Sequence, residues 1–271
     1  MKKRILFLLG LLSMIPPRFP LCAQITAQDF SFGSRTYEGT IVVCGMNSNS
    51  RRIYNVERSK VRFSPFSTFK IPNSIIALET GIISDIDNIY KWDSQKYPLE
   101  DGWPDEWSGE HTMRTAFKFS VVPFFRNIAF QIGNKKMRDF VEKFEYGNMD
   151  ISSGIDTFWL NGSLKISAEE QVEFLQKFYN GELDIAPASM DAIKDILVRE
   201  RAADYSLSGK TGGGPIDGER GSALGWYVGY VEKETDDYFF AMNIEGRSFA
   251  DIQAPRIEIT KNILRKLKIL E

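Results

Sequence analysis

Ser67-Thr68-Phe69-Lys70 is the one place in the chain where a lysine follows a serine by three residues. The apolar residues between Ile71 and Leu78 recur with helical spacing and predict that a helix follows. Residues three apart lie on one face of a helix, so the Lys70 amine is expected to reach the Ser67 hydroxyl. A serine at the N-terminus of a helix is also stabilised by the helix dipole as it becomes an alkoxide. The pattern therefore indicates a serine nucleophile with a lysine base.

A simpler interpretation of these four residues is open at this point. Ser67 can equally cap a helix while Lys70 lies on the solvent-exposed face, and a chain of this length contains about one such pair by chance. Pro72 also conflicts with the carbonyl four residues earlier, so we expect the first turn of the helix to be kinked or tightened. The choice depends on the rest of the sequence.

The composition is that of an ordinary globular protein. The 271 residues are 43% hydrophobic, 26% charged and 13% aromatic, which excludes a disordered chain, a collagen-like chain and a protein with several membrane spans. Lys and Arg number 34 against 36 Asp and Glu, so no basic field favours nucleic acid and we predict no nucleic-acid partner. One histidine and two cysteines exclude a multi-histidine or four-cysteine metal site, and no metal is predicted.

Residues 1–23 have the features of a secretory signal peptide. Three basic residues at positions 2–4 precede the apolar run Ile5 to Ile15, which is too short to span a bilayer. Leu21-Cys22-Ala23 is a suitable cleavage site, and cleavage would leave 30 basic and 36 acidic residues, a net charge of −6. An uncleaved anchor and lipidation of Cys22 are the alternatives. We expect a secreted protein without stable membrane association.

Two residues with reactive side chains are expected to have no catalytic role. After cleavage Cys44 would be the only cysteine, and the apolar run Ile41-Val42-Val43-Cys44 predicts a buried strand residue without a disulfide partner. His111 is the single histidine, and we expect it to be a surface or loop residue.

The chain contains no repeats, low-complexity tracts or Pro/Gly-rich linker, so we expect one domain over residues 24–271. Apolar and β-branched segments predict strands at Gly39–Met46, Arg52–Val56, Leu224–Val231 and Tyr238–Ile244. Helical spacing predicts helices at Asn134–Phe144, after the capping box Ser167-Ala168-Glu169-Glu170, and after Pro255. This order indicates an α/β (α+β) fold: a sheet region, about residues 24–62 and 195–271, that carries a helical region, about residues 63–194.

A second chemical motif, Lys210-Thr211-Gly212, lies ahead of the predicted strand that contains Trp226. Gly209-Lys210-Thr211 resembles the end of a phosphate-binding loop, but Asp204 stands where that loop needs its first glycine. The following residues, Gly212-Gly213-Gly214-Pro215, do not start a helix. A strand whose Lys and Thr point into a cleft suits a substrate that carries a carboxylate. A glycine-rich hairpin turn is the alternative.

Five motifs occur in order along the chain, and together they carry a family resemblance. They are Ser67-Thr68-Phe69-Lys70, Ser120-Val121-Val122, Tyr146-Gly147-Asn148, Phe158-Trp159-Leu160 and Lys210-Thr211-Gly212. With these motifs the chain resembles the class D, oxacillinase-type serine β-lactamases from about residue 39 to the C-terminus. The resemblance implies the fold shared by serine β-lactamases and penicillin-binding transpeptidases. In that fold a mostly antiparallel sheet is flanked by helices, and the site lies between the sheet and a helical subdomain.

The resemblance also implies a role for each catalytic residue. Ser67 would be the acylated nucleophile, and Lys70 would be N-carboxylated by CO2, with no other cofactor. Trp159 would donate its indole N–H to the carbamate, and Ser120 would relay a proton toward the leaving nitrogen. Core packing for Trp159 and an ordinary helix-end or loop serine for Ser120 are the alternatives.

The carboxylation implied for Lys70 has a physical basis. A lysine that four apolar neighbours shield from water has a lowered pKa, and only the neutral amine attacks CO2. The four neighbours are Phe69, Val122, Trp159 and Leu160. The carbamate would then be a carboxylate-like base for both acylation and deacylation.

The resemblance places substrate binding on the second motif. Lys210, Thr211 and Arg256 would bind the substrate carboxylate, with a solvated surface position as the alternative for Arg256. Backbone N–H groups of Ser67 and Gly213 would form an oxyanion hole. Gly213 departs from the family, where a bulkier residue is common, so the substrate preference at this point is open.

Two further segments are expected to shape the pocket. The segment from Asp101 to His111 is rich in Trp, Pro and acidic residues and predicts a longer loop than usual at the rim of the cleft. We hypothesise that Trp103 and Trp107 bound the pocket and tune which β-lactams fit. Tyr146-Gly147-Asn148 is expected to be a structural turn in the pocket wall.

The sequence therefore predicts a periplasmic enzyme that hydrolyses the β-lactam amide of penicillin-type antibiotics and confers resistance to them. Its partner would be a small β-lactam molecule, and the chain would be a monomer or a homodimer. The alternatives are a β-lactam sensor domain that stays acylated and a peptidoglycan transpeptidase or carboxypeptidase. A sensor domain normally follows several membrane spans, and here one short apolar segment precedes the domain. The apolar pocket of Trp159 and Val122 suits a carboxylated lysine and argues against a transpeptidase.

Overall fold

The computed structural model describes residues 24–100, 102–216 and 222–270. The predicted signal peptide, residues 1–23, lies outside them. Within the described ranges, no helix combines the length and the apolar character needed to cross a bilayer. The same ranges contain no group of three or more His, Cys, Asp or Glu side chains that could hold a metal ion.

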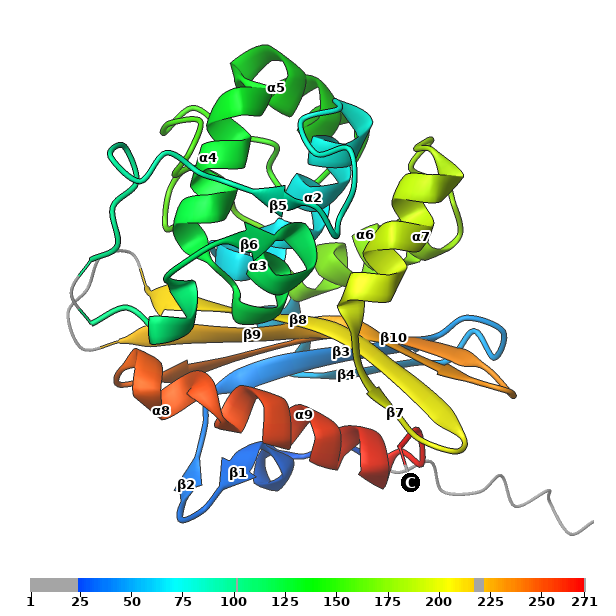
Figure 1. Cartoon of the computed structure of the whole chain (residues 1–271). Coiled ribbons are helices and arrows are strands. Elements are labelled where there is room, and N and C mark those ends of the chain that lie inside the picture. Colours follow the sequence, from blue (N-terminus) through cyan, green and yellow to red (C-terminus); the bar gives the residue numbers. More distant parts are fainter. Residues whose placement is uncertain (1–23, 101, 217–221, 271) are drawn as a thin grey trace, which may run out of the picture.

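A six-stranded antiparallel sheet forms the centre of the molecule (Figure 1). Its strands are β3 (Gly39–Gly45), β4 (Arg51–Tyr54), β7 (Val198–Arg201), β8 (Tyr205–Pro215), β9 (Ala223–Lys233) and β10 (Asp237–Gly246). The order across the sheet is β4-β3-β10-β9-β8-β7. The four strands predicted from the sequence are confirmed as β3, β4, β9 and β10. The glycine-rich residues after Lys210 continue β8 and do not form a hairpin turn.

The central strands are buried along most of their length because both faces of the sheet are covered. Every residue of β3 is buried, and so are Phe239 to Ile244 of β10. Strands buried on both faces favour continuous apolar segments over alternation. Cys44 lies in β3 as a buried, free thiol, and burial raises its pKa. The prediction of a buried strand cysteine is confirmed.

One face of the sheet is covered by the two ends of the chain (Figure 1). The elements are η1 (Ala27–Phe30), β1 (Ser31–Phe32), β2 (Arg35–Thr36), α8 (Phe249–Gln253) and α9 (Pro255–Lys266), where η denotes a 3-10 turn. Ile259 and Ile263 of α9 join Phe240 and Met242 of β10 in one apolar cluster. This confirms the helix predicted after Pro255.

The opposite face carries the helical elements between β4 and β7 (Figure 1). They are α1 (Val56–Ser59), η2 (Phe66–Phe69), α2 (Lys70–Glu79), η3 (Asp105–Trp107), α3 (Met113–Phe119), α4 (Val122–Ile132), α5 (Asn134–Lys143), α6 (Ala168–Tyr179) and α7 (Pro187–Leu197), together with the small pair β5 (Ile89–Tyr90) and β6 (His111–Thr112). The predicted helices α5 and α6 are confirmed. The Ser167 side chain accepts from the Glu170 N–H, and the Glu170 side chain accepts from Ser167, so the capping box is formed.

The serine-lysine motif folds into two joined helical turns. η2 contains Ser67 and runs directly into α2, which begins at Lys70. Pro72 lies in the first turn of α2, where a backbone N–H has no intrahelical partner. The tightening expected from Pro72 is found as the 3-10 turn that precedes the helix.

The prediction that His111 is a surface or loop residue is wrong, because this residue lies in β6 and is only 4% exposed. Its ring stacks on Trp92 with centroids 5.9 Å apart, and Nδ1 lies 3.1 Å from Thr115 Oγ1. The Phe119 ring contacts the His111 ring as well. Aromatic residues that are distant in the sequence thus supply a cover that the local sequence does not reveal.

Candidate active site

Three separate elements bring their polar side chains together above the sheet. Ser67 comes from η2, Ser120 from the turn between α3 and α4, and Lys210 from β8. Lys70, at the start of α2, lies between them. The predicted nucleophile, base and proton relay are therefore neighbours in space.

Lys70 and Lys210 both lie within hydrogen-bond distance of the Ser120 hydroxyl. Lys70 Nζ lies 2.7 Å from Ser67 Oγ and 3.0 Å from both the carbonyl oxygen and Oγ of Ser120. Lys210 Nζ lies 3.0 Å from the same Ser120 Oγ and donates to the Thr211 carbonyl at 2.9 Å. A continuous chain of hydrogen bonds therefore joins Ser67 to Lys210.

The backbone is strained on both sides of this chain. Phe66 has φ 48° and Ser120 has φ 60°, in the left-handed region that residues other than glycine rarely adopt. The Phe66 N–H donates to the Trp159 carbonyl at 3.0 Å, and the Phe66 side chain is buried. Tertiary contacts thus hold the conformation that presents Ser67, while the turn at Ser120 directs its carbonyl and hydroxyl toward Lys70.

The Lys70 amine is fully buried, and burial lowers its pKa to about 7. Water does not solvate the ammonium, and its hydrogen-bond partners are neutral hydroxyl and carbonyl oxygens. The charged form is therefore disfavoured, and close to half of the amines are neutral near pH 7. A neutral amine beside a serine can accept the hydroxyl proton.

The apolar surroundings of Lys70 agree with the predicted pocket in part. Phe69 and Trp159 are buried and stack on one another with centroids 5.4 Å apart. Val122 and Leu160 are only half-buried. Phe125 is a further neighbour that the sequence did not predict, and its ring centroid lies 5.3 Å from Lys70 Nζ. Its position in the helix that follows Ser120-Val121-Val122 is the signal that could have identified it.

The indole N–H of Trp159 is a buried donor that makes no hydrogen bond to any described residue. Most buried polar groups have a partner, and an unsatisfied one costs about 1–3 kcal/mol. Trp159 stacks on Phe69, the residue directly before Lys70. The Trp159 indole is therefore an unused hydrogen-bond donor in the aromatic cluster next to Lys70.

Lys210 is a second buried amine, only 2% exposed. Burial and the charges of Lys70, Arg199 and Arg256 hold the pKa of Lys210 well below its usual value. Like charges in a poorly hydrated site favour loss of a proton or binding of an anion. Lys210 is thus suited to either role.

β8 packs directly against the turn that carries Ser67, and Gly212 allows this contact. A Cβ atom at Gly212 would lie 2.7 Å from the Pro65 carbonyl oxygen and 3.0 Å from Thr68 Cγ2. The first of these atoms belongs to the backbone and has little freedom to move. The glycine of Lys210-Thr211-Gly212 therefore sets the distance between strand and nucleophile.

β8 has a free edge beyond Ser208, because β7 pairs only with its first residues. Arg199 Nε donates to the Gly209 carbonyl at 2.8 Å, so this oxygen points to the free edge. Main-chain groups two residues apart in a strand point the same way, so those of Thr211 and Gly213 also point to this edge. The Gly213 N–H is thus directed to the side on which a substrate would lie.

Arg256 reaches β8 from α9 and is only 6% exposed. Its Nη1 donates to the Gly212 carbonyl at 2.6 Å, and burial lowers its pKa to about 10. A Cβ atom at Gly213 would lie 2.7 Å from this nitrogen, so glycine here leaves room for the guanidinium. The structure therefore brings Lys210, Thr211, Gly213 and Arg256 together, and Arg256 is not a solvated surface residue.

Tyr146-Gly147-Asn148 forms a turn behind the site. Tyr146 is buried with its ring 5.6 Å from that of Phe69. The Asn148 side chain donates to the Ser163 carbonyl at 2.8 Å and accepts from the Lys165 N–H at 2.9 Å. The turn thus supports the wall of the lysine pocket.

Trp103 and Trp107 form an edge-to-face pair with centroids 4.9 Å apart, and both are half-buried. Trp107 Nε1 donates to the carbonyl of Phe119 at 2.9 Å. Because Phe119 precedes Ser120, this hydrogen bond ties the aromatic pair to the turn that carries the proton relay. Two half-exposed indoles therefore lie at the rim of the site.

Comparison with known proteins identifies this arrangement. Residues 36–267 match the family of the penicillin-binding protein transpeptidase domain. The chain is 39% identical over 220 residues to the β-lactamase OXA-10 of Pseudomonas aeruginosa, a match that covers 81% of each protein. The crystal structure of the class D β-lactamase YbXI from Nostoc is 38% identical with a TM-score of 0.80, and the match covers 86% of this chain and 95% of that one.

The fold and the site define a serine enzyme of the penicillin-binding transpeptidase type. Within that type, the chain belongs to the class D serine β-lactamases, hydrolases of the β-lactam amide. The chain is also 36% identical over 251 residues to the regulatory protein BlaR1 of Bacillus licheniformis, and this match covers 92% of the chain but 40% of BlaR1. The expected family and fold are confirmed.

Substitution of Gly212 by alanine is expected to lower the rate of Ser67 acylation by about 100-fold or more, because an ångström of misplacement is enough for such a loss. The added Cβ would push η2 away from β8. The rate is measured by intact mass after mixing with a penicillin. Ser206→Ala on the same strand is the control, since the Ser206 hydroxyl has no partner among the described residues. Equal rates for both variants would contradict this role of Gly212.

The double variant Trp103→Ala/Trp107→Ala is expected to change the relative kcat/KM values for penicillins and carbapenems by several-fold, because aromatic contacts contribute roughly 0.5–1.5 kcal/mol each. The readout is a set of steady-state rates for substrates with different side chains. Trp92→Phe, which replaces an indole outside the rim, is the control. Unchanged relative rates in the double variant would remove the hypothesis that the pair tunes selectivity.

Proposed function

We propose that this chain hydrolyses penicillin-type β-lactams through an acyl-enzyme on Ser67, with N-carboxylated Lys70 as the general base. The observation that carries the proposal is the position of Lys70, which is fully buried and 2.7 Å from the Ser67 hydroxyl. We further propose that the chain acts in the periplasm after removal of residues 1–23 and confers resistance to the β-lactams it hydrolyses.

The residues around Lys70 fit a carbamate. Formation joins the neutral Nζ to the carbon of CO2 and releases one proton, and the lowered pKa supports it. The unpartnered indole N–H of Trp159 would donate to the new carboxylate group. When present, the carbamate supplies a carboxylate-like base for the serine and for the hydrolytic water.

Acylation follows from the hydrogen-bond chain. Ser67 Oγ attacks the lactam carbonyl carbon as its proton passes to the base at Lys70, and the N–H groups of Ser67 and Gly213 stabilise the charge on the carbonyl oxygen. The ring C–N bond then breaks, and the Ser120 hydroxyl donates its proton to the leaving nitrogen. Lys210 resupplies Ser120 from 3.0 Å away, which its lowered pKa favours.

The substrate carboxylate is expected to bind to Lys210, Thr211 and Arg256. Both cations are buried, and neither forms an ion pair with an acid in the described ranges. Burying a charge without an ion-pair partner is costly. A substrate carboxylate that pairs with Lys210 and Arg256 would offset this cost and is therefore expected to bind strongly. The same interaction fixes the lactam ring relative to Ser67.

The similarity to the regulatory protein BlaR1 favours one second candidate, the acylated β-lactam sensor. A sensor and a hydrolase share the acylation of Ser67. They differ in whether water then releases the acyl group. Turnover therefore distinguishes the two.

The purified chain lacking residues 1–23 is expected to hydrolyse a penicillin continuously, faster when bicarbonate is added to CO2-depleted buffer. Intact mass should detect the Ser67 adduct only while substrate lasts. Lys70→Ala should lower turnover by roughly 100-fold to 10,000-fold, the usual contribution of a general base. A stable adduct without turnover would instead identify a sensor or a transpeptidase.

At a fixed concentration of dissolved CO2, kcat/KM is expected to fall as the pH falls below about 7. Burial lowers the pKa of Lys70 to about 7, so below this pH the amine is protonated and neither accepts a proton nor reacts with CO2. Well below this pH the loss should approach about tenfold per pH unit. A pH profile that stays flat down to about pH 5, with the fold intact by circular dichroism, would contradict the proposed base.

A further inference from the structure

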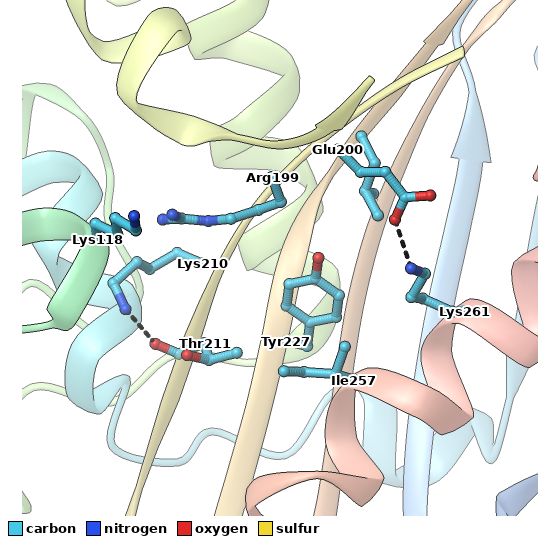
Figure 2. A pocket seen from close by; sticks show the side chains of 9 residues that line it. Lys118, Arg199, Glu200, Lys210, Thr211, Tyr227, Ile257 and Lys261 are labelled. Carbon is cyan, nitrogen blue, oxygen red and sulfur yellow. Dashed lines mark hydrogen bonds and ion pairs between the residues drawn. The ribbon is translucent and has the colours of Figure 1, made fainter. Parts of the chain in front are cut away.

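A pocket of about 320 Å³ lies beside the site, at the free edge of β8 (Figure 2). Its polar lining comes from β7, β8, α3 and α9, and includes Lys118, Arg199, Glu200, Lys210, Thr211 and Lys261. At about 30 Å³ per water molecule this volume equals that of roughly ten waters. The pocket therefore has room for a charged substituent of a substrate.

The pocket continues the substrate-binding edge in one direction. Gly213, Thr211 and Gly209 follow one another along the free edge of β8, and Arg199 contacts the carbonyl of Gly209. The proposed oxyanion hole uses Gly213, and the proposed carboxylate site uses Lys210 and Thr211. The pocket therefore includes the proposed carboxylate site and extends from it along the strand, on the side away from the scissile amide.

The charges of the pocket are unbalanced. Glu200 is its single acidic residue, and the carboxylate of Glu200 already binds Lys261 and the Tyr205 hydroxyl. Lys118 and Arg199 have no acidic partner among the described residues. Two exposed cations therefore face the pocket beside buried Lys210.

Arg199 and Lys210 both contact the Phe117 ring. Arg199 Cζ lies 5.5 Å and Lys210 Nζ 5.7 Å from the centroid of the same Phe117 ring. Figure 2 shows the Arg199 guanidinium and the Lys118 amine directed toward one another. Since Nε of Arg199 is used by Gly209, the Nη groups are available to a ligand. Arg199 and Lys118 are therefore able to bind a second anionic group of a ligand, in addition to the carboxylate expected at Lys210.

We propose that Arg199 and Lys118 form a second anion subsite, which makes the enzyme selective for β-lactams with two anionic groups. The second group is carried on the ring carbon next to the one that bears the carboxylate, the position of the side arm in a cephalosporin. This inference rests on the proposed function, because it takes the orientation of the lactam from the carboxylate and oxyanion sites.

The test compares two cephalosporins with the same acylamino group, one with a neutral acetoxymethyl arm and one with a carboxymethylthiomethyl arm. The readout is the second-order rate constant of Ser67 acylation by intact mass, which does not require turnover. The dianionic to monoanionic ratio is expected to fall about tenfold in Arg199→Gln, as for loss of a hydrogen bond to a charged group. Lys118→Gln, on a different element, is expected to lower the same ratio.

Arg201→Gln is the matched control, since Arg201 is an exposed arginine of the same strand that does not line the pocket. An unchanged ratio in both subsite variants, or an equal fall in Arg201→Gln, would overturn the subsite. Arg199→Lys, which keeps the charge but loses the two-pronged geometry, should give an intermediate ratio. Acylation without turnover in every variant would contradict the proposed hydrolysis but leave this comparison valid.

Discussion

The Lys70 amine occupies a position where neither water nor a carboxylate stabilises its charge, and the rest of the site is built around this constraint. Neutral oxygens of Ser67 and Ser120 receive its hydrogen bonds, and aromatic rings exclude solvent. The strained turn at Ser120 exists because its carbonyl and hydroxyl must both reach this one nitrogen. The unpartnered indole of Trp159 belongs to the same aromatic surroundings, and a buried donor without an acceptor is costly. If Lys70 is carboxylated as proposed, dissolved CO2 would contribute to the stability of the fold as well as to its chemistry.

The sheet provides the rigid support that such a site needs. β8 is held by β9 along its whole length, and it contacts the nucleophile turn at Gly212, which has no side chain of its own. Arg256 approaches from the opposite face, in the space that Gly213 leaves free. The nucleophile turn and the strand that carries Lys210 and Thr211 are thereby held against each other by the sheet, and sites built on such regular elements are more precise than sites on loops.

Residue spacing and helix-capping patterns predicted the features that depend only on residues close together in the chain. The spacing of Ser67 and Lys70 correctly predicted that the two side chains meet, and the capping box at Ser167 correctly predicted the start of α6. The roles of Ser120 and Trp159 needed the family resemblance, because nothing near them in the chain marks them. Three residues escaped prediction because only tertiary packing defines their environment: Phe125 against Lys70, His111 under Trp92, and Arg199 at the edge of β8.

The free edge of β8 has a consequence for association between copies of the chain. An unpaired strand exposes N–H and C=O groups that the edge of another molecule can extend, which is a common route to aggregation. A strand that must remain open for substrate cannot be covered by a helix or another strand. Here the edge is bordered by Lys118, Arg199 and Lys210, and β8 ends at Pro215, which has no N–H to donate. The positive charges that we propose to bind an anionic substrate would therefore also repel the same edge of a second copy and protect the chain from edge-to-edge pairing.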